Sequence, residues 1–191
     1  MKHSFHELIG DIISENITGE GLRILKDPAC DPDGHILPLY YSKVEDEGES
    51  VTVNNSRSRI FTNVDLLILK KNEIKVIIEI EESNFEPIHI FGKFFAAAFS
   101  SSYSHYTEAK DFIEMADSVL FVQILDTENI KIGKTQKPKQ WRNIEESIKK
   151  IIPIADSKIK AYRLFYGDVS EFNAKKKPEE LINYIRKFLG A

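Results

Sequence analysis

The feature that most restricts the fold is a set of apolar runs that are continuous rather than alternating. "LLIL" at 66–69 and "VII" at 76–78 belong to the segment RIFTNVDLLILKKNEIKVIIEIEES, and "SVLFVQIL" at 118–125 is a third run. Continuous runs of this kind are typical of strands that are covered on both faces. The first two runs are predicted to be long strands joined by a tight turn at 70–73. Such a sheet needs helices on both of its sides.

Apolar residues at helical spacing predict those helices. They are expected at about 5–17, from Pro87 to Phe99, and at 107–117, 139–154 and 177–190. A further strand is expected at 158–167, and a short β-rich piece at 50–55. The stretch from Gly21 to Ser42 is expected to be irregular, with an apolar piece at 35–42 as a candidate strand. The sequence therefore predicts an α/β fold in which a mixed sheet is flanked by helices, formed as one domain over residues 1–191.

Composition narrows the class of protein. Apolar residues are 42% and charged residues 29% of the 191 residues, which is close to the average of globular domains and unlike that of disordered chains. No apolar run approaches the roughly 20 residues of a membrane-spanning helix, and the acids near the N-terminus are unlike a secretory signal. Cys30 is the only cysteine, so no intrachain disulfide is expected. We expect a cytoplasmic protein without a membrane partner.

Three acidic residues stand on the two predicted strands. Glu79 and Glu81 are two residues apart, so in a strand both project from one face. Asp65 begins the preceding strand, and in an antiparallel hairpin it lies roughly opposite residues 77–79. Carboxylates that converge in this way repel one another unless a cation compensates them, and oxygen ligands of this kind suit Mg²⁺. The alternative is that Glu79 and Glu81 lie on a solvent-facing strand edge.

The pattern "NVD…EIE", set between a leading helix and a following helix and strand, resembles the PD-(D/E)XK nuclease superfamily. Asn63-Val64-Asp65 stands where the P-D of that family falls, and Glu79-Ile80-Glu81 stands where its (D/E)-X-K falls. The resemblance implies a restriction-endonuclease-like αβββαβ core over about residues 4–126, with a C-terminal α-β-α extension over 127–191. The matching motif consists of only three acidic positions. The order of the predicted helices and strands also matches that of the family and adds to the resemblance.

The chain departs from the family motif at two positions. Val64 replaces the proline, and Glu81 replaces the lysine that orients the attacking water in this superfamily. Some members, certain type II restriction endonucleases among them, have E-x-E instead, and this chain looks like one of them. A relocated lysine is the alternative, and Lys93, four residues after His89 on the polar face of the following helix, is the candidate.

The resemblance implies phosphodiester hydrolysis assisted by one or two Mg²⁺ ions, for which Mn²⁺ is a possible substitute. Asp65, Glu79 and the main-chain carbonyl of Ile80 would hold the metal, and Glu81 would accept the proton of the water or hold a second ion. Some members add a glutamate from the first helix. Glu15 is favoured for that role because Glu7 has an expected capping role with Ser4.

Candidate DNA contacts are basic residues in a chain whose formal net charge is −4. Arg57 and Arg59 alternate just before the first acidic motif, and between residues 131 and 150 seven basic residues stand against two acidic ones. A local basic patch can bind a polyanion in an acidic protein, although such runs are also ordinary solvated surface. The residues expected to contact DNA are Arg57, Arg59, Lys93, Lys134, Lys137, Lys139 and Arg142.

These observations predict a Mg²⁺-dependent DNA endonuclease, specifically a type II restriction endonuclease that acts on double-stranded DNA. A palindromic site would require two copies related by two-fold symmetry, so a homodimer is expected. Two alternatives remain open. One is a binding module that keeps the fold without catalysis, and the other is a repair or junction nuclease that recognises the shape of its substrate.

Overall fold

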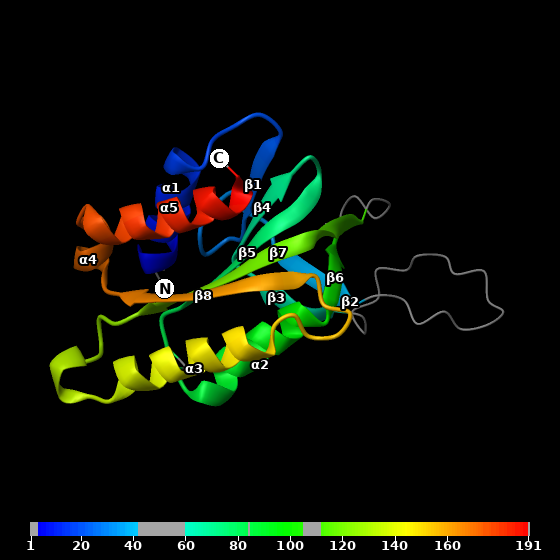
Figure 1. Ribbon diagram of the computed structural model, residues 1–191. Helices are drawn as coiled ribbons and strands as arrows, with labels where there is room; N and C mark the ends of the chain where they lie inside the picture. The colour runs from blue at the N-terminus through cyan, green and yellow to red at the C-terminus, as the bar shows by residue number, and fades with distance from the viewer. Residues whose placement is uncertain (1–3, 42–59, 84, 105–111, 191) are drawn as a thin grey trace.

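A computed structural model describes residues 4–41, 60–83, 85–104 and 112–190 of the chain. A mixed β-sheet lies between two groups of helices (Figure 1). In chain order the elements are α1 (Ser4–Asn16), β1 (Leu22–Lys26), β2 (Leu37–Tyr41), β3 (Ile60–Val64), β4 (Leu66–Lys70), β5 (Glu73–Glu81), α2 (Pro87–Ala98), β6 (Ser100–Tyr103), β7 (Ile113–Asp126), the 3-10 helix η2 (Ile132–Lys134), α3 (Lys137–Ile151), β8 (Ile159–Gly167), α4 (Val169–Asn173) and α5 (Lys176–Leu189). The α/β class predicted from the sequence is confirmed.

The strands of the described residues form one sheet with the order β1-β4-β5-β7-β6-β2-β3, and β8 pairs with β7 beside this path. β1, β4 and β5 are antiparallel neighbours, whereas β7 runs parallel to β5 and β8 runs parallel to β7. The β4–β5 turn is made by Lys71 and Asn72, both with positive φ. Two such residues form the tight hairpin turn that suits the twist of paired strands. Because β5, β7 and β8 are parallel, their carboxyl ends lie at the same edge of the sheet.

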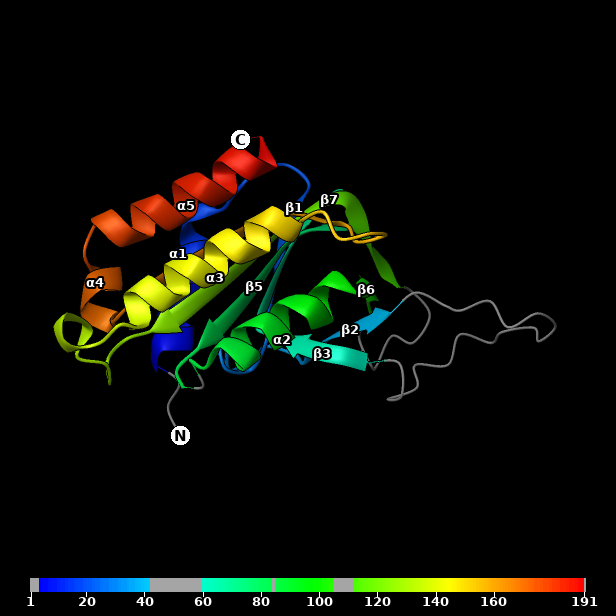
Figure 2. The ribbon, with the colours of Figure 1, turned by 60° about the horizontal axis from the view of Figure 1, so that its bottom comes forward.

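Helices cover both faces of the parallel strands, as the continuous apolar runs require. One buried cluster joins α1 and α5 to the face that bears Val76 and Ile78, and the other joins α2 and α3 to the face that bears Ile77. Figure 2 shows α2 and α3 side by side, with α1 and α5 on the other side of β5 and β7. Phe94 of α2 and Trp141 of α3 are both fully buried. Consequently, from Val76 to Ile80 the even-numbered residues of β5 face α1 and α5, whereas Ile77 faces α2 and α3.

The path through α1, β1, β4, β5, α2 and β7 runs helix, three antiparallel strands, helix, parallel strand, in the order expected from the sequence. β2, β3 and β6 are additional strands, and β2 pairs with both of the others. The chain after β7 forms α3, β8, α4 and α5. The expected C-terminal α-β-α extension is therefore present, with the short α4 in addition.

Several element predictions need correction. The helix predicted at 107–117 is wrong for residues 113–117, which begin β7, because pairing with β6 at Ile113 and Glu114 extends the strand. The stretch expected to be irregular contains β1, which pairs along the whole of β4. Asp65, which was expected to begin a strand, lies at the break between β3 and β4, and these two strands pair with different neighbours. Residues 107–111 and 50–55 lie outside the described residues.

Within the described part of the chain, no helix is both long and apolar enough to cross a membrane. Cys30 is buried and unpaired.

Candidate active site

The predicted acids meet at the carboxyl edge of the parallel strands. Leu66 of β4 pairs with Ile78 of β5, so Asp65, one residue earlier, lies next to Glu79 in register. Asp65 forms the bend between β3 and β4. Glu79 and Glu81 project from the same face of β5, toward α2. The register inferred from the sequence is therefore confirmed.

Lys93 of α2 joins this group of acids. Its Nζ donates a hydrogen bond to Oε2 of Glu79 at 2.9 Å and lies 3.8 Å from Oε1 of Glu81. α2 begins at Pro87, six residues after the end of β5, so Lys93 lies in its second turn and reaches back over the strand. Lys93 is therefore half-buried beside the two glutamates, whereas His89, one turn earlier on α2, is exposed.

His6 of α1 reaches the same edge from the opposite face of the sheet. Its Nδ1 lies 2.8 Å from Oε1 of Glu82, and its Nε2 lies 3.8 Å from Oδ1 of Asp65. The other oxygen of Asp65, Oδ2, accepts a hydrogen bond from the main-chain N–H of Ile80 at 2.6 Å. Asp65 is therefore held by β5 on one side and by α1 on the other. We refer to Asp65, Glu79, Glu81 and Lys93 as the acidic cluster.

Burial controls the proton affinity of the acidic cluster. The side chain of Glu79 is 0% exposed, and burial, followed by the charge of Asp65, raises its pKa well above the ordinary value although Lys93 opposes both. Burial also raises the pKa values of Asp65 and Glu81. Burial alone would lower the pKa of Lys93, but Glu79 and Glu81 reverse that effect and raise it. Three carboxyls share one ammonium, so the cluster binds protons more tightly than three separated carboxyls would.

Two buried polar atoms on the neighbouring strands β5 and β7 lack hydrogen-bond partners among the described residues. One is Oε1 of Glu79, and the other is Nε2 of Gln123, which is paired in register with Glu79 on the neighbouring strand β7. Oε1 of Gln123 accepts a hydrogen bond from the hydroxyl of Tyr162 at 2.6 Å. A buried polar group without a partner costs about 1–3 kcal/mol. An oxygen of Glu79 is thus available to a ligand or water that enters the site.

The donor types of the acidic cluster fit Mg²⁺, which prefers carboxylate and carbonyl oxygens. In the present arrangement, however, the carboxylates contact Lys93 and a main-chain N–H. Among the residues that the structure describes, no three His, Cys, Asp or Glu side chains are grouped in the manner of a metal site. The chemistry of the donors and the free oxygen of Glu79 fit a divalent ion, and the side chains would have to turn toward it.

A groove opens beside the cluster, between α2 and β3, which are in contact. Its volume is about 420 Å³, and Glu81 and Lys93 line one part of it. The rest of the lining comes from β3 and α2, namely Phe61, Thr62, Ile88, His89, Gly92 and Ala96. The groove therefore shares two side chains with the acidic cluster.

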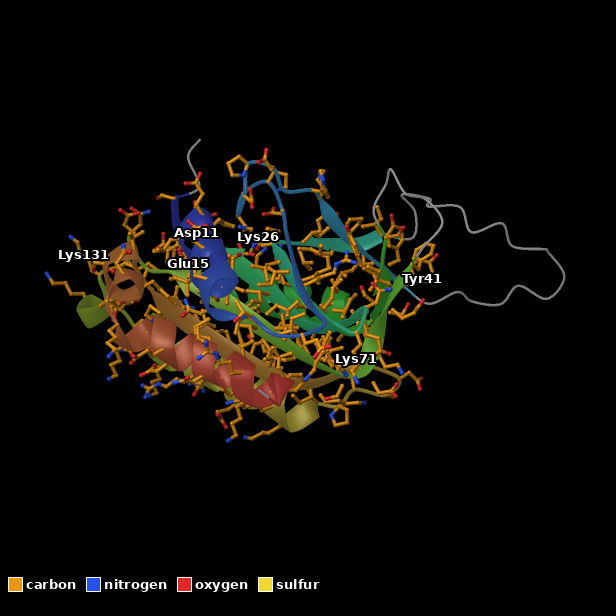
Figure 3. All side chains as sticks on the ribbon, turned by 90° about the horizontal axis from the view of Figure 1, so that it is seen from above. Asp11, Glu15, Lys26, Tyr41, Lys71 and Lys131 are labelled. Carbon is orange, nitrogen blue, oxygen red and sulfur yellow. The ribbon has the colours of Figure 1, made fainter. Side chains whose placement is uncertain are left out.

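The structure does not bring Glu15 to the cluster. Glu15 is exposed near the C-terminal end of α1, nine residues from His6 and so roughly 13 Å away along the helix axis (Figure 3). The first helix contributes His6 instead, which sequence reasoning did not single out for the site. The only signal available was its place on the predicted helix next to Phe5, and nothing in the pattern told which end of that helix meets the strands.

The predicted DNA contacts that the structure describes lie on α2, which bears Lys93, and on η2 and α3. Lys134, Lys139 and Arg142 are exposed on η2 and α3. Nζ of Lys137 lies 3.3 Å from Oε1 of Glu86, beside the start of α2. Figure 3 shows Lys131, which precedes η2, projecting outward at one end of the molecule. The predictions for residues 57 and 59 lie outside the described residues.

Comparisons with known proteins returned no matching family model, no matching curated protein and no matching solved structure.

Proposed function

We propose that the chain is a Mg²⁺-dependent DNA endonuclease and that the acidic cluster is its active site. The observation on which the proposal depends is the placement of Asp65, Glu79 and Glu81 around Lys93 at one edge of the sheet. The order of the core elements and the E-x-E motif, which resembles that of some PD-(D/E)XK nucleases, add support. A type II restriction enzyme that acts on double-stranded DNA as a homodimer in the cytoplasm is the specific form we propose.

Each residue of the cluster has a chemical role in this proposal. Asp65, Glu79 and the carbonyl of Ile80 would hold Mg²⁺, or Mn²⁺ in its place. A bound ion of this kind supplies a water of lowered pKa and neutralises charge on the phosphate oxygens. Lys93, already protonated between Glu79 and Glu81, would donate to a phosphate oxygen, and Glu81 would accept a proton from the attacking water. His6 would keep Asp65 in position.

The test is cleavage of a long duplex DNA with Mg²⁺, with Mn²⁺ or with EDTA. We expect discrete fragments that need the metal, and we expect Asp65→Asn and Lys93→Met each to lower the rate by at least roughly 100-fold. Glu15→Gln is the matched control, because this acid lies outside the cluster, and it should retain the wild-type rate. Metal-dependent cleavage that survives Asp65→Asn would contradict the proposal.

One observation favours a second candidate, a DNA-binding module without catalysis. Lys93 already compensates Glu79 and Glu81, so the carboxylates are stable together without a metal ion. This candidate predicts that the wild-type protein binds duplex DNA in EDTA and leaves it intact with every divalent metal. The cleavage assay and a mobility-shift assay on the same DNA therefore separate the two candidates.

A further inference from the structure

We propose that the groove between α2 and β3 receives one nucleotide that is turned out of the double helix next to the bond that is cut, so that a duplex with unpaired nucleotides at that point, or a single strand, binds more tightly than fully paired duplex. This inference rests on the proposed function, because it takes the acidic cluster as the place where the phosphate lies. It concerns the class of substrate that the same site accepts.

The position of the groove supplies the first argument. Glu81 and Lys93 belong both to the acidic cluster and to the wall of the groove. A phosphate held at Lys93 therefore has its neighbouring sugar and base directed along the groove or away from the protein. His89, at the rim, offers a further polar contact for the sugar or for the next phosphate.

The chemistry of the lining supplies the second argument. Phe61 of β3 keeps 48% of its surface exposed, and Ile88 of α2 keeps 74%. The ring of Phe61 packs against that of Tyr41, with centroids 5.1 Å apart, which fixes its place in the groove. An exposed aromatic ring beside a cationic group is the arrangement on which unpaired bases stack. In an intact duplex the bases already stack on one another and are not available to such a ring.

The third argument is that the groove is kept open by small residues. Gly92 and Ala96 line it from α2, and a Cβ added at Gly92 would meet no atom within 4 Å. A glycine inside a helix makes the helix less stable than an alanine would. The open space at Gly92 is therefore accompanied by a loss of helix stability. The volume of about 420 Å³ lies at the small end of ligand pockets, which suits one base and sugar and excludes a duplex.

The test compares three fluorescein-labelled probes: a 20-nucleotide single strand, its 20-base-pair duplex, and that duplex with a bulge of three unpaired nucleotides. Binding is followed by fluorescence anisotropy with Ca²⁺, and cleavage is followed under single-turnover conditions with Mg²⁺. We expect the single strand and the bulged duplex to bind at least roughly tenfold more tightly than the intact duplex, because extracting a paired base opposes binding.

Two groove variants have matched controls elsewhere on the surface. Phe61→Ala removes the ring and should weaken single-strand binding roughly 5- to 100-fold. Its control is Phe99→Ala, which removes a ring that lies outside the groove and is 54% exposed, and which should leave single-strand binding unchanged. Gly92→Leu fills the groove and should weaken single-strand binding at least roughly tenfold, because the base can no longer stack on Phe61. Its control is Asn183→Leu, which adds an exposed leucine to α5 and should leave single-strand binding unchanged. Circular dichroism verifies that all four variants fold.

The possible results separate this inference from the proposed function. If Mg²⁺-dependent cleavage requires Asp65 but the intact duplex binds as tightly as the single strand, or the groove variants behave like their controls, the groove inference is overturned and the proposed function stands. If nothing is cleaved with any divalent metal, the proposed function is overturned, and weaker single-strand binding by Phe61→Ala and Gly92→Leu then supports the groove only as a binding site for an unpaired nucleotide. A dimer that Gly92→Leu dissociates in sedimentation, with unchanged oligonucleotide binding, would assign the groove to a second copy and overturn the inference.

Discussion

Glu79 combines complete burial with two acidic neighbours, and this combination has consequences for stability. Its pKa is raised mainly by burial, and Lys93 offsets only part of that effect. In the unfolded chain Glu79 releases its proton at its ordinary pKa, whereas in the folded chain it keeps the proton to higher pH. The folded state therefore binds more protons above the ordinary pKa, and stability falls as pH rises through that interval.

We expect the Glu79→Gln variant to lose part of this pH dependence. In the absence of divalent metal, the free energy of unfolding of the wild type should fall between pH 5 and pH 8 relative to that of the variant. At the alkaline end of this range the variant should be the more stable of the two, because only in the wild type does unfolding release the proton that the buried Glu79 carboxyl keeps in the folded state. Urea unfolding at each pH measures the difference.

The control for that measurement is Glu180→Gln, which changes an exposed glutamate on α5. Its unfolding free energy should follow the wild type across the whole pH range. A Glu79→Gln variant that also follows the wild type would show that the buried carboxyl is ionised in the folded protein throughout, and our description of the cluster would be wrong.

At the scale of elements, two helical glycines, Gly92 and Gly10, show how the space around a residue decides whether Gly→Ala raises or lowers stability. In α2, a Cβ at Gly92 would meet nothing within 4 Å, but in α1 a Cβ at Gly10 would lie 2.9 Å from the carbonyl oxygen of Cys30. Alanine favours a helix over glycine by about 0.5–1 kcal/mol where there is room. Where there is no room, as at Gly10, the neighbouring backbone at Cys30 has to move to accommodate the added methyl group.

We predict opposite signs for the same change in the two helices. Gly92→Ala should raise the free energy of unfolding by about 0.5–1 kcal/mol. Gly10→Ala should lower it by about 1–3 kcal/mol, which is the usual effect of overpacking. Chemical denaturation of the two variants beside the wild type tests this pair, and a stabilising Gly10→Ala would contradict the packing of α1 against the loop at Cys30.

The elements that sequence patterns identified are those with long, continuous or periodic apolar runs. β5 and the later part of β7 were predicted because burial on both faces leaves continuous β-branched runs, and α3 and α5 because their apolar residues recur at helical spacing. β6, whose sequence is SSSY, has no such signal and forms because β2 and β7 pair with it. The start of β7 was predicted as helix because a short apolar piece between acids fits either period.

The candidate site was predictable where it depends on strand register and was missed where it depends on packing between distant elements. Asp65 and Glu79 could be paired because a short hairpin fixes their register. Lys93 was named as an alternative because it closely follows β5 along the chain. His6 was missed and Glu15 was wrongly favoured, because the orientation of α1 against the sheet is set by tertiary contacts such as that of Phe5 with Phe172.

At the scale of the whole molecule, the fold brings side chains from four elements to one edge of the sheet. α1 supplies His6, the bend before β4 supplies Asp65, β5 supplies both glutamates, and α2 supplies Lys93. Binding of a divalent ion would displace protons from this cluster, because metal ligands must be deprotonated. A metal titration therefore reports on the whole arrangement at once, both through its affinity and through the protons that it releases.

The most direct test is calorimetric titration of Mn²⁺ into the wild type, Asp65→Asn and Glu15→Gln, each in two buffers that differ in ionisation enthalpy. We predict saturable binding to the wild type and to Glu15→Gln with a buffer-dependent heat that reveals proton release, and binding at least roughly tenfold weaker to Asp65→Asn. Equal affinity of Asp65→Asn and the wild type for Mn²⁺, or no binding to the wild type at millimolar Mn²⁺, would contradict the account.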